Sequence, residues 1–329
     1  MKFRCRRLVH VSVSGIGSRL KGLASALRVA QYYDMPLTVA WQNNWGCNCP
    51  FHKLFTIQPN APLINIVPEN QLISLINPQE QPHPVANGYN KTYTIKQAAT
   101  TKIVFDEQWL YDYDIIQFIN WGCIWLPNEK LIATQPAEMY YQELRIVRQA
   151  VQQLMKYIQP IPTITKKIQT FLDKHPTLTQ ALGVMVRRGD LVDNPNLNTY
   201  DKNRCIALSQ FHQEIVAYAN HIIGNHKHIR LPSYISSENA FDVITQLQKL
   251  DEQKYRDWCT LDYMYYPRQM AIDMTTHMKH PLDCTTIEGV QEALVDLLLL
   301  SKTKSILSSQ SNFSWLAAAI NDKPLIQVK

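Results

Sequence analysis

The sequence predicts an α/β protein built from two Rossmann-like domains that face a cleft. Three observations lead to this prediction. The chain has 329 residues, which is too long for one ordinary core. Strand-like and helix-like segments alternate in both halves, and the proline-bearing stretch QPIPTITKK at 159–167 separates the two series. We therefore expect an N-terminal domain over 1–160 and a C-terminal domain over 161–329.

The N-terminal domain opens with a pattern typical of a strand, a glycine turn, a helix and a second strand. LVHVSVS at 8–14 alternates and is rich in β-branched residues, and GIG at 15–17 ends this strand. Apolar residues with the spacing of one helical face follow, namely Leu20, Leu23, Ala24, Leu27 and Ala30. MPLTVAW at 35–41 is typical of the next strand. This order predicts parallel pairing.

The remainder of the N-terminal domain is less regular. Residues 42–135 are rich in proline, asparagine and aromatic residues, and their pattern resolves no individual elements. The aromatic side chains there either line a ligand groove or belong to the core. Residues 136–158 are roughly periodic and predict a helix, and a further helix around 164–173 leads into the second domain.

The C-terminal domain repeats the alternation of strands and helices. The predicted strands are 181–186, 228–236, 304–309 and 324–328. The predicted helices are 207–223, 239–250, 285–301 and 313–320. The third helix is expected to begin with a capping box from Thr285 to Glu288. The tyrosine-rich stretch LDYMYYPRQM at 261–270 is interpreted as a core edge or the lining of a ligand groove.

Composition narrows the function. The 33 Lys and Arg residues against 27 Asp and Glu give a net charge of +6, and only KFRCRR at the N-terminus clusters them. This argues against a nucleic-acid binder, whose basic residues gather on one face. The N-terminus has no apolar signal-peptide core, and the longest apolar run, LVDLLLL at 294–300, is too short to span a bilayer. We therefore expect a soluble, cytoplasmic protein with no integral membrane segment.

The cysteines predict no metal site. Of the seven, only Cys47 and Cys49 lie close together in sequence, whereas a zinc site usually needs two such pairs. We expect reduced and mostly buried thiols, as in cytoplasmic proteins.

Three turns at strand ends are candidate ligand sites, because parallel sheets bind ligands at the carboxyl ends of their strands. The first is SGIGSRLKG at 14–22. Gly15 and Gly17 would let the backbone approach a phosphate at a helix N-terminus, with Arg19 nearby. An ordinary tight turn explains the same residues equally well.

The second turn is VRRGD at 186–190. Adjacent strand residues face opposite ways, so at most one of Arg187 and Arg188 reaches the cleft directly. A guanidinium group suits a diphosphate, because it can donate two parallel hydrogen bonds. The other arginine would pair with Asp190. Alternatively, both arginines form a surface pair bridged to Asp190.

The third turn is SSQSNFS at 308–314, where small hydroxyl residues precede a helix. Such a cluster is either an ordinary N-cap or a binding site for an anion.

Together these stretches resemble a known family. GIGSRLKGLASALRVAQYYDMPLTVAW resembles the G-x-G-N-R-L signature of the nodulation-type and O-fucosyltransferase superfamily. VRRGD resembles its H-x-R-x-x-D motif, and LVDLLLLSKTKSILSSQSNFSWLAAAI resembles its last motif. The α-1,6-fucosyltransferases share this order, and the likeness extends from about residue 8 to residue 329.

The resemblance implies a GT-B-like enzyme that transfers L-fucose from GDP-fucose, with inversion and without metal or cofactor. The C-terminal domain would bind the nucleotide-sugar donor, and the N-terminal domain would help to hold a glycan or polypeptide acceptor. By position, Arg187 would clamp the β-phosphate and Asp296 would accept hydrogen bonds from guanine N1–H and N2–H. The phosphates would be bound by the last turn, with Phe313 packing beside Ser311, Asn312 and Ser314.

Two positions depart from the family pattern. Met185 stands where the second motif has histidine, and Ser18 stands where the first often has asparagine. Met185 favours an alternative, a non-catalytic sugar-nucleotide or glycan-binding protein on the same fold. For catalysis, the nearest carboxylates are Asp190 and Asp193, and Asp193 is the candidate base.

Overall fold

The computed structural model divides the chain into two units, Met1–Ile161 and Pro162–Lys329. This division falls one residue beyond the predicted domain boundary. The residues that the structure describes are 3–44, 46–59, 61, 64–67, 92–96, 103–119, 124–129, 136–187, 206–223, 229–254, 259–268, 286–309 and 311–328. In these ranges no helix is long and apolar enough to cross a membrane.

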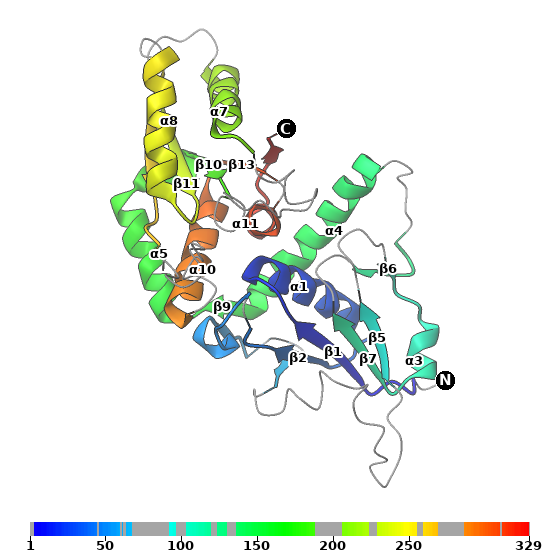
Figure 1. Cartoon of the computed structure of the whole chain (residues 1–329). Coiled ribbons are helices and arrows are strands. Elements are labelled where there is room, and N and C mark those ends of the chain that lie inside the picture. Colours follow the sequence, from blue (N-terminus) through cyan, green and yellow to red (C-terminus); the bar gives the residue numbers. More distant parts are fainter. Residues whose placement is uncertain are drawn as a thin grey trace, which may run out of the picture. The chain divides into compact units, whose positions relative to one another are not determined.

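The first unit is built on a parallel sheet in the order β4-β2-β1-β7-β5 (Figure 1). Its strands are β1 (Arg7–Ser12), β2 (Leu37–Trp41), β4 (Ile64–Ile66), β5 (Thr92–Lys96) and β7 (Ile115–Ile119). All but the first residue of β1 is buried, as expected of a central parallel strand. Helix α1 (Ile16–Tyr32) packs on β1 and β2, and α4 (Pro136–Tyr157) packs beside α1.

Short elements complete the first unit. Strand β3 (Phe55–Ile57) pairs antiparallel with β9 (Ile158–Pro160), and β6 (Ile103–Val104) pairs parallel with β8 (Ile124–Trp125). The helical turns are the 3₁₀ helix η1 (Phe51–Lys53) and α3 (Gln108–Asp112). Except for β9, all of these lie in the region 42–135 that the sequence pattern left unresolved.

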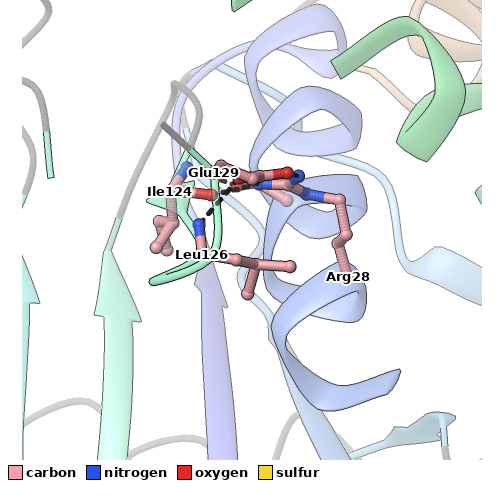
Figure 2. Close-up of polar contacts among 5 residues, drawn as sticks. Arg28, Ile124, Leu126 and Glu129 are labelled. Carbon is pink, nitrogen blue, oxygen red and sulfur yellow. Dashed lines mark hydrogen bonds and ion pairs between the residues drawn. The ribbon is translucent and has the colours of Figure 1, made fainter. Parts of the chain in front are cut away.

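A partly buried ion pair ties α1 to the segment around β8 (Figure 2). The Arg28 guanidinium donates to both oxygens of Glu129 and to the carbonyl of Ile124. Glu129 also accepts from the backbone N–H of Leu126 at 2.7 Å, and the Ser25 hydroxyl accepts from the N–H of Ile124 at 2.7 Å. The first helix and a segment about a hundred residues later are thus joined by charge-assisted bonds.

The second unit is a doubly wound parallel sheet in the order β12-β11-β10-β13-β14. Its strands are β10 (Leu182–Met185), β11 (Ile229–Ser236), β12 (Cys259–Tyr265), β13 (Ser305–Ser308) and β14 (Leu325–Gln327). Its helices are α5 (Pro162–Lys174), the 3₁₀ helix η3 (Pro176–Gln180), α7 (Leu208–Ile223), α8 (Ala240–Lys254), α10 (Ile287–Lys302) and α11 (Asn312–Ile320).

Helices cover both faces of this sheet (Figure 1). Leu182 and Val184 belong to a buried cluster with apolar residues of α7 and α8. On the opposite side of β10, a Cβ placed on Gly183 would lie 2.6 Å from Thr303 Oγ1 and 2.7 Å from Leu300 Cδ1. A side chain there would force the Leu300 and Thr303 side chains to shift, because α10 and the residue that follows it pack closely on the strand.

The predicted α/β class with parallel sheets is confirmed, and every strand and helix predicted for the second domain is present. Three details differ. Residues 259–265 form an edge strand, β12. The expected linker 159–167 is not a loop, because Pro160 ends β9 and Pro162 is the first residue of α5. The N-cap of α10 is Thr286, not Thr285, and it accepts from the N–H of Gly289 at 3.0 Å, so the predicted capping box is wrong.

Candidate functional site

Arg187 lies at the carboxyl edge of the second sheet, next to the point where the strand order reverses. In this sheet β10 pairs with β11 on one side and with β13 on the other, so the reversal falls between β10 and β13. The N–H of Val186 still donates to the carbonyl of Ser236 at 2.9 Å, so the pairing extends to the residue before Arg187. Open parallel sheets bind ligands at such reversals, and sequence reasoning placed Arg187 at this edge.

The serine-rich turn follows β13 at the same edge. Ser311 is the N-cap of α11, and its hydroxyl accepts from the N–H of Phe313 at 3.2 Å. The Ser314 hydroxyl donates to the Ser311 carbonyl at 3.1 Å and lies 2.7 Å from the Ser308 hydroxyl. The turn is thus a well-formed cap. The other N–H groups of the first turn of α11 have no intrahelical partner, which is the arrangement that favours an anion.

Asp296 lies in the middle of α10, and only 1% of it is exposed. Its carboxylate accepts from the Ser236 hydroxyl at 2.7 Å, from the Tyr234 hydroxyl and from the Arg268 guanidinium. Burial raises the pKa of Tyr234 well above its usual value, and the Asp296 charge raises it further, so Tyr234 stays protonated and donates. Contact between Asp296 and guanine stays a prediction, and the carboxylate would have to make it in addition to these bonds.

Arg268 is a residue of this edge that the sequence analysis missed. It lies three residues beyond β12, and only 6% of its side chain is exposed. Its guanidinium pairs with Asp296, and the guanidinium carbon lies 5.2 Å from the centre of the Phe313 ring. This distance is typical of a cation–π contact. The sequence does carry a signal for this residue, because Arg268 follows a strand-like run, as Arg187 does. That run, 261–270, was interpreted as a core edge or as the lining of a groove.

Burial also affects the neighbouring tyrosine. It raises the pKa of Tyr266 to about 12, and the Glu292 and Asp296 carboxylates contribute to the rise. The phenol is therefore neutral at physiological pH.

The turn after β1 is held from within the first unit by Arg19. This side chain is fully buried, and it donates to the Ser14 carbonyl at 2.6 Å, the Gln42 carbonyl at 2.6 Å and Asn44 Oδ1 at 2.8 Å. Burial lowers the pKa of the Arg19 guanidinium, whose carbon lies 4.9 Å from the centre of the Trp41 ring. Arg19 thus acts as an internal donor, and a direct contact between Arg19 and a substrate stays a prediction.

Gly15 and Gly17 form the start of α1. Gly15 is its N-cap, and Gly17 is buried in the first turn. A Cβ on Gly46 would come within 2.7 Å of the Ser14 carbonyl carbon, and Ser14 itself has a φ of 74°. The segment that carries Gly46 therefore lies directly against this turn, and only glycine fits the contact.

The chain resembles known proteins in its structure. Neither a known protein family nor a curated protein matches the chain by sequence. A mutant of FUT1 from Arabidopsis thaliana, solved with GDP, matches with a TM-score of 0.57 and 13% identity, covering 98% of this chain and 69% of that one. NodZ α-1,6-fucosyltransferase, soaked with GDP-fucose, matches at 0.51 and 14%, covering 96% and 92%. POFUT1 with GDP matches at 0.50 and 13%, covering 100% and 99%.

The chain has the fold of these fucosyltransferases. Within this fucosyltransferase fold, the described residues place Arg187, Asp296 and the turn from Ser311 to Ser314 in the second unit. They place Gly15, Gly17 and Arg19 in the first.

Three expected site residues, Arg188, Asp190 and Asp193, lie outside the described residues. The different roles expected of Arg187 and Arg188 therefore stay predictions, and so does the role of Asp193 as the base. The part of the chain that the structure describes contains no group of three or more metal-ligating side chains. It does contain three buried cysteines that form no disulfide bond, Cys5, Cys47 and Cys49.

Proposed function

We propose that the chain is an inverting glycosyltransferase that moves L-fucose from GDP-fucose to a glycan or protein acceptor without a metal ion. One observation carries the proposal. Arg187 and the capped N-terminus of α11 lie at the strand reversal of the second unit, in a fold shared with fucosyltransferases solved with GDP or soaked with GDP-fucose. That edge is where a nucleotide diphosphate binds in parallel sheets.

The proposed chemistry is a single displacement at the anomeric carbon. The acceptor hydroxyl oxygen forms the new bond, the bond from carbon to the diphosphate oxygen breaks, and its electron pair leaves with GDP. Negative charge grows on the β-phosphate during this step. The Arg187 guanidinium and the backbone N–H groups at the start of α11 are the donors that would stabilise it. The proton of the acceptor hydroxyl passes to a carboxylate, for which Asp193 is the candidate.

Binding of guanine by Asp296 would require a change in the hydrogen bonds that its carboxylate already makes. A carboxylate has about four lone-pair sites. Three donors of the chain already bind Asp296. Accepting hydrogen bonds from both N1–H and N2–H of guanine would occupy two lone-pair sites. One of the three donors of the chain would therefore have to release the carboxylate. The Arg268 guanidinium carbon lies 5.2 Å from the ring centre of Phe313, in the first turn of α11, and we propose that Arg268 is the donor that yields.

A second candidate function is a non-catalytic binder of a sugar nucleotide or glycan. Met185 favours it, because this residue replaces the motif histidine and is 4% exposed. A buried thioether is at most a weak hydrogen-bond acceptor, so it cannot replace the histidine as a donor near a diphosphate.

The experiment is to incubate the full chain with GDP-fucose and to measure GDP release with and without candidate acceptors, together with GDP binding by calorimetry. Acceptor-dependent release supports the transferase. GDP binding without turnover over the whole acceptor panel supports the non-catalytic binder. If neither GDP nor GDP-fucose binds, the transferase and the sugar-nucleotide binder are both overturned, and only a glycan binder remains.

A further inference from the structure

The first unit contains a cavity that the proposed chemistry does not use. Its volume is about 610 Å³, within the usual range of small-molecule sites. It lies where β2 and β4 end, beside η1 and β3, so it opens at the carboxyl edge of the first sheet. It is lined by Trp41, Asn43, Pro50, Phe51, His52, Phe55, Thr56, Ile57, Ile66 and Val67.

Three aromatic rings form a rigid apolar floor. The Trp41 and Phe51 ring centres are 5.3 Å apart with an edge-on geometry, and the Phe51 and Phe55 centres are 5.5 Å apart. The indole N–H of Trp41 donates to the carbonyl of Cys49 at 2.9 Å, so its polar group is satisfied away from the cavity. All three side chains are almost completely buried, so this floor is held in place by the core of the unit.

The rim is polar and uncharged. Asn43 Oδ1 is buried and has no hydrogen-bond partner among the described residues, so this acceptor lacks a donor. Such groups are rare in native proteins and call for an explanation, of which a ligand is one. His52 and Thr56 are exposed and add an imidazole and a hydroxyl. Among the described residues that line it there is no Lys, Arg, Asp or Glu, so this lining does not favour a phosphate or an acidic peptide.

We propose that this cavity binds a neutral monosaccharide ring of the acceptor, and that the acceptor is therefore a glycan rather than a polypeptide. A sugar ring places its C–H groups on one face, against the apolar lining, in which Ile57 is exposed and the three rings contribute small areas. Its hydroxyl groups stand around the edge, where one can donate to Asn43 Oδ1 and others can bond with His52 and Thr56. A peptide side chain would fill the apolar floor but would use little of this rim. The identity as an acceptor site rests on the proposed transferase function.

The test is a binding titration of the full chain with short oligosaccharides of glucose, galactose and N-acetylglucosamine, in the absence of donor. At least one series should bind. Asn43→Ala and His52→Ala should each weaken that binding about tenfold, the scale of one lost hydrogen bond. Lys53→Ala is the matched control, because Lys53 is exposed on the same 3₁₀ helix and does not line the cavity. It should bind like the wild type.

A second variant blocks the cavity without removing a polar group. Ile57 is 36% exposed, so Ile57→Trp should fold and should abolish oligosaccharide binding. All variants should keep their melting temperature within a few degrees and should keep the wild-type affinity for GDP, since the cavity residues lie in the first unit.

The outcomes separate the two proposals. Failure of every oligosaccharide series to bind, or binding that none of the three cavity variants alters, would overturn the glycan site. So would a peptide acceptor whose KM rises in the cavity variants. If oligosaccharides bind as expected while GDP and GDP-fucose do not, the cavity stands as a glycan site and only the transferase proposal falls.

Discussion

Two arginines show how differently one residue type is used in this chain. Arg19 is fully buried, and backbone carbonyls and an amide oxygen surround its guanidinium. A charge without such partners would be too costly to bury. Arg187 lies beyond a strand end and is only partly buried. The first arginine therefore organises the backbone, and the second is placed where a ligand can reach it.

Replacing Arg187 with lysine tests its role in catalysis. Lysine keeps the charge but loses the two-pronged geometry, so kcat should fall about 10²–10³-fold, the usual effect of losing one transition-state donor. Arg230→Lys is the control, because Arg230 is exposed and lies at the start of β11. Since β10 and β11 are parallel, it lies at the edge of the sheet opposite to Arg187. Arg188→Lys should act mainly on the melting temperature. Near-normal kcat in Arg187→Lys, with activity lost in a well-folded Arg188→Lys, would reverse the two assignments.

The stability role of Asp296 follows from its pairing with Arg268. Asp296→Asn removes the charge that balances a guanidinium with only 6% of its side chain exposed. The free energy of unfolding should fall by about 3–5 kcal/mol, as for other broken buried pairs. Ser236→Ala removes one neutral donor from the same carboxylate and should cost only about 1 kcal/mol. Denaturant titrations of both variants measure the difference, and equal losses would contradict the buried ion pair.

Guanine recognition by Asp296 needs a separate measurement. If the carboxylate binds guanine, Asp296→Ala should weaken GDP binding by about 1.5–3 kcal/mol, the scale of a hydrogen bond to a charged group. UDP binding should change less, because uracil does not offer the same pair of donors. Calorimetry on the folded variant decides the question. An equal loss for GDP and UDP would show that Asp296 acts only by holding Arg268.

At the scale of elements, the decisive feature is the N-terminus of α11. The helix is short, apolar and buried over most of its length, and it begins directly above the edge where β10 and β13 end. Its capping serine and the N–H groups of its first turn come from one local pattern, SSQSNFS. A cap and an anion site are compatible, because the cap side chain accepts from one N–H group and the first turn has others without an intrahelical partner.

The two ends of α11 provide a matched pair of variants. Ser311→Ala removes the N-cap and should lower the free energy of unfolding by about 1 kcal/mol. Asn321→Ala, at the other end, removes hydrogen bonds to the Ser301 carbonyl and hydroxyl and should cost about 0.5–1.5 kcal/mol. Only Ser311→Ala should also weaken GDP binding. If both variants bind GDP like the wild type, the start of α11 does not hold the diphosphate.

At the scale of the whole molecule, both units use the same design, a parallel sheet whose strand order reverses beside its first strand. In the second unit the reversal presents Arg187 and α11. In the first unit the β1 turn beside the reversal is closed by Arg19 and Gly46, and the cavity lies further along the same edge, beyond β2 and β4. The same topology therefore places a candidate ligand site beside the reversal in one unit and a cavity further along the edge in the other.

Transfer activity of the full chain should survive chelation. The proposed donors to the leaving diphosphate are an arginine and helix N–H groups, which can take up the charge without a divalent ion. GDP release is to be compared in EDTA, in buffer and with added Mg²⁺ or Mn²⁺, and the three rates should agree. A rate that collapses in EDTA and returns with the metal would overturn the metal-independent mechanism.

The sequence alone determined the α/β class, the order of elements in the second unit, and the placement of Arg187 and of Ser311 to Ser314 at strand ends. These properties are local, because periodicity, caps and strand-ending residues act over a few neighbouring positions. The region 42–135 stayed unresolved because several of its strands are only two or three residues long. Such strands show no period, and their pairing depends on distant segments, as β3 depends on β9.

Only the tertiary structure decided which polar groups meet. Arg268 and Asp296 are 28 positions apart, on a strand end and in mid-helix, and no local pattern predicts their contact. Likewise, Arg19 faces inward because the segment after β2 folds back to offer it carbonyl groups. Burial depends on how elements stack, and a side chain's partners depend on burial. The sequence therefore shows where charged groups stand along the chain, and the packing of the elements decides which of them remain available to a ligand.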